Sequence, residues 1–310
     1  MGGNIYFYFM KFEIIINKWA NFYFFLQNLS LWHFSNVEDY NRMWEKEIGQ
    51  FSLKEIRALE EFKMIHLKYP FGKKYLGRPF FLKKNQWKSV KQLVLSQESS
   101  RLKEIFSLFQ NKFAIIYKKD LPLFKKWQKN LQNINTFPVV NRINNILSTC
   151  YNVPPLKGKV KIYLLFSSPI EWGGGANLNS NSITLEICRC RFEKEKLPFV
   201  LGAIWHELIH AYFEKAYFSH LLSKVFSRNQ KKISLTNEVV CQAVSYPYGF
   251  LTKKVLNISI SRKKLTKGKA QMFSVLRKIV GKYLKQKKPL DREFIEEALF
   301  LINKFKIKGD

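Results

Sequence analysis

The chain has 310 residues, of which 46% are hydrophobic, so it can build one substantial core or two modest domains, and wholesale disorder is excluded. Its 53 Lys and Arg face 23 Asp and Glu, giving a formal net charge of +30 that would attract nucleic acid, an anionic membrane surface or an acidic partner. Only 11 of these 53 basic residues are arginine, whose guanidinium group can form two hydrogen bonds to one phosphate. We therefore expect mainly a solvated, lysine-rich surface, with an anionic partner as the alternative.

The first 32 residues are apolar, but Lys11, Glu13 and Lys18 interrupt them. No uncharged run approaches the ~18 residues that a membrane span needs, and the pattern of a secretory signal is missing. We predict a cytoplasmic protein without a membrane span. Residues 11–17 are expected to form a strand, and Met10 is an alternative start that would make residues 1–9 an upstream extension.

Residues 1–150 are predicted to be a mostly helical N-terminal region, a candidate wall for a cleft. Ser52 and Glu55 have the spacing of a capping box, and apolar residues follow at helical intervals. Residues 69–81 carry Pro and Gly and are expected to be a loop. Further amphipathic helices are expected at 88–95, 98–117, 121–132 and 139–149.

Residues 151–310 change in character. Short β-rich runs at 159–166 and 181–189 are joined by a segment with three consecutive glycines, Gly173 to Gly175, which we expect to form a hairpin turn or a loop over a cleft. An apolar helix then starts near Pro198, and a polar interval, 227–234, leads to another helix. The segment 253–310 is basic, with two helices and Asp291 as an N-cap.

The four cysteines are Cys150, Cys188, Cys190 and Cys241. Cys188 and Cys190 lack the spacing of a structural zinc knuckle, and no second pair completes one. We expect reduced thiols.

The apolar helix contains the pentapeptide HELIH. On a helix, His206 and His210 lie one turn, about 6 Å, apart on the same side, so that both imidazoles can reach one Zn²⁺. Glu207, beside the metal rather than on it, can move protons. A chance match in a core helix is the alternative. The chain holds only five His, however, and burying these groups without a partner would cost several kcal/mol.

A catalytic zinc site usually has three protein ligands, so a third ligand is needed beside the two histidines. Glu214 would lie ~12 Å from His206 on a continuous helix, and His220 would need the chain to turn where no Gly or Pro stands. His33 and His66 are remote. Glu238, after a polar connection long enough to double back, is the preferred candidate, and we expect it to open the next helix.

The segments HELIHAY and NEVVCQA resemble the signature of gluzincin-type zinc metallopeptidases, over roughly residues 159–250. The resemblance implies zinc ligation by His206, His210 and Glu238, with Glu207 as general base. Cys241 and Gln242 depart from the pattern, and Gln242 would hydrogen-bond a ligand histidine.

The same resemblance implies an edge strand that holds substrate by main-chain pairing, here with Ala176, Asn177 and Leu178. An oxyanion helper is also implied, with Tyr246, Tyr248 and His220 as candidates. The expected fold is α+β and mainly helical, a zincin-like core with a small mixed or antiparallel sheet packed on the motif helix.

The expected function is that of a zinc-dependent peptidase that hydrolyses peptide bonds with zinc-activated water and one zinc per chain. The motif helix is also similar to that of SprT-like proteases, which act on DNA-associated proteins, although the expected third histidine with a following glycine is missing. A third alternative is a non-enzymatic, basic nucleic-acid-binding protein with a structural or degenerate zinc site.

Overall fold

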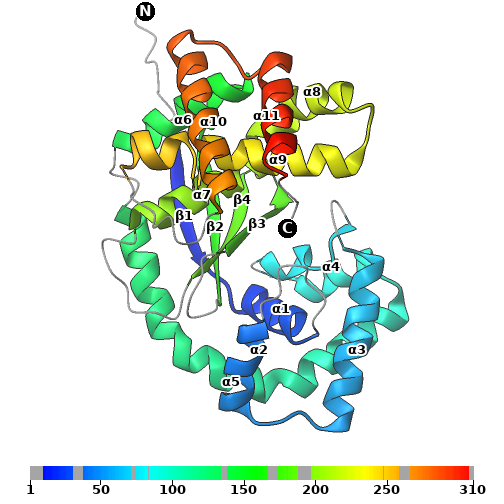
Figure 1. The fold of residues 1–310 in the computed structure, drawn as a ribbon. Helices are drawn as coiled ribbons and strands as arrows, with labels where there is room; N and C mark the ends of the chain where they lie inside the picture. The colour runs from blue at the N-terminus through cyan, green and yellow to red at the C-terminus, as the bar shows by residue number, and fades with distance from the viewer. Residues whose placement is uncertain are drawn as a thin grey trace, which may run out of the picture.

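The computed structural model describes residues 10–30, 38–70, 74–82, 84–133, 138–166, 173–179, 181–187, 197–246, 248–257 and 266–306. These residues form a mainly helical protein built on one small mixed sheet (Figure 1), which confirms the expected α+β class. Cys188 and Cys190 lie outside the described residues, whereas Cys150 and Cys241 are free, buried thiols.

The sheet has four strands in the order β1-β2-β4-β3, namely Lys11–Ile16, Lys159–Phe166, Ser182–Ile187 and Gly173–Asn179. The strands β1, β2 and β4 run parallel, and β3 runs antiparallel to β4 at the edge. All three predicted strands are present. The glycines 173–175 are part of β3, so the expected turn or loop there was wrong. Glycine fits here because β3 lies closely against a helix, as described below.

The first helix, α1 (Lys18–Leu29), was not predicted. Its N-cap is Asn17, whose side chain accepts hydrogen bonds from the backbone N–H groups of Trp19 and Ala20. The helix is buried on nearly every side and therefore lacks the amphipathic pattern of a surface helix. Much of the chain's aromatic content packs around it; Phe22 stacks on Phe113 with ring centroids 4.3 Å apart.

The remaining N-terminal helices mostly follow the sequence pattern. The capping box of Ser52 and Glu55 is present at the start of α3 (Leu53–Lys68). The segments expected as two helices form one, α5 (Ser96–Gln132), which contains Pro122 and curves around the lower half of the molecule (Figure 1). Tertiary packing of an apolar face along the whole helix joins the two predicted segments, 98–117 and 121–132, across the proline. The other elements here are α2 (Glu38–Ile48), the short 3₁₀ helix η2 (Arg78–Phe81) and α4 (Gln86–Leu93).

The C-terminal half begins after α6 (Pro138–Tyr151). The motif helix is α7 (Leu197–Ala211), followed by the 3₁₀ turn η5 (Phe213–Lys215), α8 (Tyr217–Val225) and α9 (Gln230–Val244). The helix α9 starts well before Glu238 because the side chain of Asn229 caps it, so Glu238 lies inside the helix rather than at its start. A short π-helix, η6 (Leu251–Val255), precedes α10 (Lys267–Lys285) and α11 (Arg292–Lys304), which Asp291 caps as expected.

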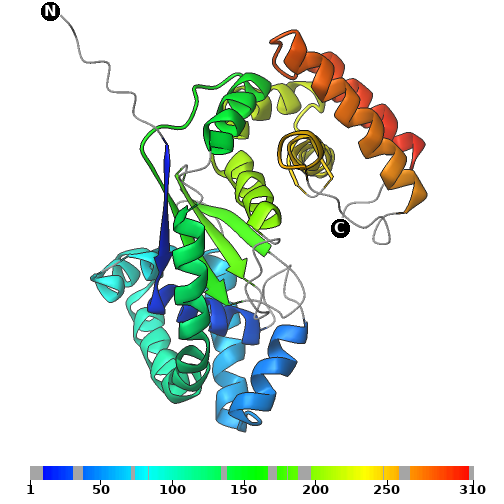
Figure 2. The same cartoon turned by 90° about the vertical axis from the view of Figure 1, so that its left-hand side faces the viewer.

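Most helices gather at two opposite ends of the sheet, and α6, although it precedes β2, lies with the C-terminal helices (Figures 1 and 2). Helices α1 to α4 surround the end where β1 and β2 finish, and α8 to α11 surround the other end, while α7 packs on β3 and β4. Strand β1 comes from the first range, so the sheet draws on both predicted regions; the division at residue 150 stays a prediction. Among the described helices, none combines the length and the apolar character needed to cross a membrane.

Candidate metal centre

Helix α7 has an apolar face and a polar face. Its apolar side chains, among them Ile204, Trp205 and Leu208, are fully buried. The three polar residues His206, Glu207 and His210 are each only partly buried and line a common cavity. The apolar residues therefore hold the helix in the core, and the polar face borders the cavity.

Three ligand groups converge beside α7. The Nε2 atoms of His206 and His210 are 3.3 Å apart. The Glu238 carboxylate reaches across from α9, with Oε2 3.2 Å from Nε2 of His210 and Oε1 3.6 Å from Nε2 of His206. Around a tetrahedral zinc with bonds of about 2.1 Å, neighbouring ligand atoms would be about 3.4 Å apart. The three groups thus fit the metal predicted from the motif.

The other nitrogen of His210 has a carboxylate partner. Its Nδ1 lies 2.8 Å from Oε2 of Glu214, and the side-chain amide of Asn237 donates to the same oxygen at 2.8 Å. Such a partner fixes the tautomer that leaves Nε2 free for a metal and raises its basicity. The sequence reasoning treated Glu214 only as a ligand and missed this arrangement. The i, i+4 spacing from His210 is the signal that could have revealed it.

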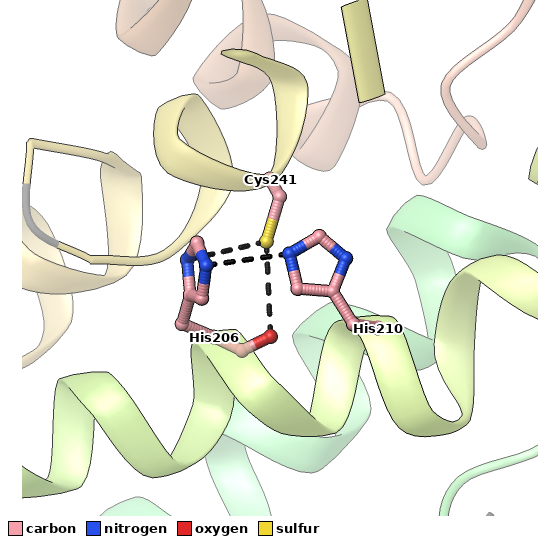
Figure 3. A group of neighbouring side chains, drawn as sticks. All are labelled: His206, His210 and Cys241. Atoms are coloured by element: carbon pink, nitrogen blue, oxygen red, sulfur yellow. Dashed lines mark hydrogen bonds between the residues drawn. The ribbon is translucent and has the colours of Figure 1, made fainter. Parts of the chain in front are cut away.

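The Nδ1 atom of His206 faces the end of α9. It lies 3.1 Å from the carbonyl oxygen of Tyr246, 3.4 Å from Oγ of Ser245 and 3.3 Å from Sγ of Cys241. Figure 3 shows the two imidazoles rising from α7 and the thiol reaching between them from above. His206, His210 and Cys241 offer ligand atoms that all lie within 4.8 Å of one another, so these three could also hold a metal.

Two ligand sets therefore compete, and geometry favours the one with Glu238. The thiol contacts Nδ1 of His206, whereas Nε2 of the same ring faces His210 and Glu238. Glu238 also lines the cavity, while Cys241 is fully buried. An ion held by both Nε2 atoms and Glu238 would keep an open side toward the cavity, which a catalytic zinc requires.

The charges of the centre suit a cation. Burial favours the neutral acid of Glu238, but the hydrogen bond and charges of the two imidazoles outweigh it and lower the pKa of Glu238 to about 2. Burial opposes protonation of His206, yet the neighbouring Cys241 and Glu207 raise the pKa of His206 to about 9. Without metal, imidazolium and carboxylate compensate each other, and a metal ion would displace the protons.

Glu207 lies against the edge strand. A Cβ on Gly174 would come within 2.6 Å of Cγ of Glu207, so only glycine leaves room for this carboxylate. Burial raises the pKa of Glu207, and the carboxylates of Glu238 and Glu214 add to the effect against the opposing histidines. A carboxyl group with a raised pKa is suited to proton transfer near neutral pH.

Replacing Gly174 by alanine is therefore expected to displace Glu207 without removing a metal ligand. If the centre is a hydrolytic zinc site, Gly174→Ala should keep its zinc, measured by metal analysis, and lose about 10²-fold in turnover, as misplacement by about 1 Å can cost. Gly175→Ala is the matched control, because its Cβ would meet Oγ1 of Thr184 at 3.0 Å instead of Glu207. Equal losses in the two variants would contradict this role of Gly174.

The centre opens into a cavity of about 320 Å³. Its walls come from both halves of the chain: Tyr23, Phe24 and Gln27 of α1 line it opposite residues of β3, α7 and α9. Ala176 and Leu178, predicted to hold substrate, lie on this wall with the glycines of β3. Asn177 belongs to the same strand, but its side chain is not described.

Of the other candidates, Gln242 and the Tyr246 carbonyl contact the centre, whereas Tyr248 and His220 do not line the cavity. Nε2 of Gln242 donates to Oε1 of Glu238 at 2.7 Å, so it contacts the carboxylate rather than a ligand histidine. The Tyr248 ring packs on Phe273, and the Tyr246 ring lies close to Gly202; neither residue is among those lining the cavity. His220 is exposed on α8. His66 is buried against the Tyr23 hydroxyl, and His33 lies outside the described residues.

Comparisons of the chain with family models, curated proteins and solved structures give no match.

Proposed function

We propose that this protein is a zinc-dependent peptidase, with zinc held by His206, His210 and Glu238. The observation that carries the proposal is the convergence of three non-thiolate ligand groups, whose nitrogen and oxygen atoms lie 3.2 to 3.6 Å apart, beside a fourth group, Glu207, that lines the same cavity but is not among them. Two histidines, a glutamate ligand and a spare carboxylate are the donor set of hydrolytic zinc centres.

The roles of the chain's own residues follow from their positions. Glu207 accepts the proton of the attacking water and returns it to the leaving amine. Glu214 holds His210 in one tautomer, and the Tyr246 carbonyl does the same for His206. A bound zinc would supply the Lewis acid that activates water and polarises the scissile carbonyl.

The edge strand supplies a place for an extended substrate. Within the described residues, strand β3 is paired on one side only, with β4, so its other side can add a strand of peptide by main-chain hydrogen bonds. The carbonyl of Leu178 already accepts a hydrogen bond of 2.6 Å from Nη2 of Arg78. Pairing is therefore expected along the earlier, glycine-containing part of β3.

The second candidate is a structural metal site made by His206, His210 and Cys241. The contact between Cys241 and His206 favours it, because thiolate ligands are typical of closed structural zinc sites. A structural site needs neither the cavity nor a free carboxylate, and both are present beside this centre. For the SprT-like alternative, the exposed His220 gives no support as a third ligand.

Removal and return of the metal test the peptidase. The purified protein is expected to contain one zinc per chain and to cleave an unfolded protein such as reduced, alkylated casein. A chelator should abolish cleavage, and stoichiometric zinc should restore it, while far-UV circular dichroism shows the fold retained. Cleavage that survives complete loss of zinc, or a zinc-loaded protein that cleaves no protein or peptide, would overturn the proposal.

A further inference from the structure

A second large hollow lies away from the metal centre, between α6, η6 and α10. Its volume is about 1060 Å³, and it shares no lining residue with the metal cavity. We call it the basic groove. Six exposed cationic side chains line it: Arg142, Lys254, Lys278, Lys282, Lys285 and Lys287.

The lining of the basic groove holds no Asp or Glu, and none of its six exposed cations has an ion pair within the described parts of the chain. Lysines elsewhere do have carboxylate partners, such as Lys68 with Glu98 at 2.7 Å and Lys119 with Glu47 at 2.7 Å. The described residues therefore do not neutralise the positive charge of this groove, which can bind an anionic ligand.

The charge is also segregated along the sequence. Helix α10 is 19 residues long; it contains several Lys and Arg residues but no Asp or Glu. The neighbouring helix α11 does contain acidic residues. Lys278, Lys282 and Lys285 follow one another at i, i+4 and i+7, on one face of α10 over about 10 Å. Like charges at this spacing destabilise an isolated helix, and an anionic ligand would relieve that repulsion.

The shape favours a polymer over a flat surface. The groove is concave, with the half-buried Phe250 and Ile146 among its lining residues and Gly281 leaving room beside the Phe250 ring. The side chain of Arg277 is held in place, because its Nη1 donates a hydrogen bond to the Tyr248 carbonyl at 2.7 Å. A bilayer is flat and would meet only the rim, whereas a strand of phosphates can follow the hollow.

We propose that the basic groove binds the phosphate backbone of a nucleic acid without sequence preference. Lysines act as point charges on phosphates and read no base edges, so the affinity would depend on salt rather than on sequence. Because the groove and the metal cavity have separate walls, this binding does not depend on the peptidase activity. It would tether the chain to nucleic acid while leaving the metal cavity open.

The test measures binding of fluorescein-labelled DNA, a 20-nucleotide single strand and a 20-base-pair duplex, by fluorescence anisotropy across a series of salt concentrations. The full-length protein is expected to bind, with affinity falling steeply as salt rises. The variant Lys278→Gln/Lys282→Gln/Lys285→Gln should lose on the order of 10²-fold in affinity at 0.1 M salt. Its log–log salt slope on the duplex should fall by about 2 to 3.

The matched control is Lys118→Gln/Lys125→Gln/Lys129→Gln, which removes the same charge from three exposed lysines on α5. It should bind DNA almost as the unaltered protein does. Equal losses in the two triple variants would mean that only total charge matters and would overturn the proposal. Absence of binding at 50 mM salt, or binding only to vesicles containing phosphatidylserine, would overturn it as well.

Discussion

Glu207→Gln is expected to keep zinc and to lose peptide hydrolysis by about 10²- to 10⁴-fold, the usual contribution of a general acid–base group. The amide has nearly the shape of the carboxylate and fits beside Gly174, but it cannot accept a proton. Zinc content should remain at one per chain because Glu207 is not among the three converging ligands. Casein cleavage and metal analysis on the same preparation measure both quantities.

The matched control for this variant is Glu60→Gln, an exposed carboxylate on α3 that is not among the residues lining the cavity. It should cleave at the unaltered rate. A Glu207→Gln protein that cleaves as fast as the unaltered one would exclude the role of Glu207. One that loses zinc as well would place the carboxylate on the metal and so contradict the assignment of ligands.

Glu238→Ala and Cys241→Ala are expected to behave in opposite ways. Loss of Glu238 removes a ligand, so zinc affinity should fall by more than the roughly 10- to 100-fold that loss of a ligand's hydrogen-bonding partner costs. Cleavage should disappear with the metal. Loss of Cys241 should leave zinc and cleavage largely intact, because its thiol lies at Nδ1 of His206 and not at Nε2. Competition with a chromophoric chelator measures both affinities.

Cobalt substitution gives a readout of the ligands that does not depend on activity. The cobalt form of the unaltered protein should lack the near-ultraviolet charge-transfer absorption of a cobalt–thiolate bond. If that absorption is present and disappears in Cys241→Ala, the centre is the thiolate site and the structural candidate replaces the peptidase. Gln242→Ala serves as the control, because it removes only the 2.7 Å hydrogen bond to Glu238.

The centre depends on contacts that no single segment makes alone. Helix α7 carries His206, His210 and Glu207, α9 carries Glu238, and the edge strand limits the space around Glu207. Residues of α1 close the far side of the cavity. A cleft between two halves of a chain is a common place for a ligand, and here described residues of the N-terminal half line one wall of the cavity.

Local patterns in the sequence determined much of what the structure shows. The capping box at Ser52, the N-cap at Asp291 and the strand at 159–166 depend on neighbouring residues only, and the structure confirms them. The spacing of His206 and His210 depends only on helical geometry, so the sequence alone could place the two imidazoles beside each other. Glu238 was the preferred third ligand because the connection before it is long enough to double back and because of the resemblance to gluzincins. It does lie beside the two imidazoles.

Tertiary structure alone decided the rest. Helix α1 has no amphipathic period because it is buried on almost every side, and α5 continues through Pro122 because its apolar face is packed along its length. The glycines of β3 looked like a turn, but Gly174 is held to glycine by the side chain of Glu207, which comes from another element. Each of these outcomes depends on residues far apart in the chain, and a pattern read over neighbouring positions carries no information about them.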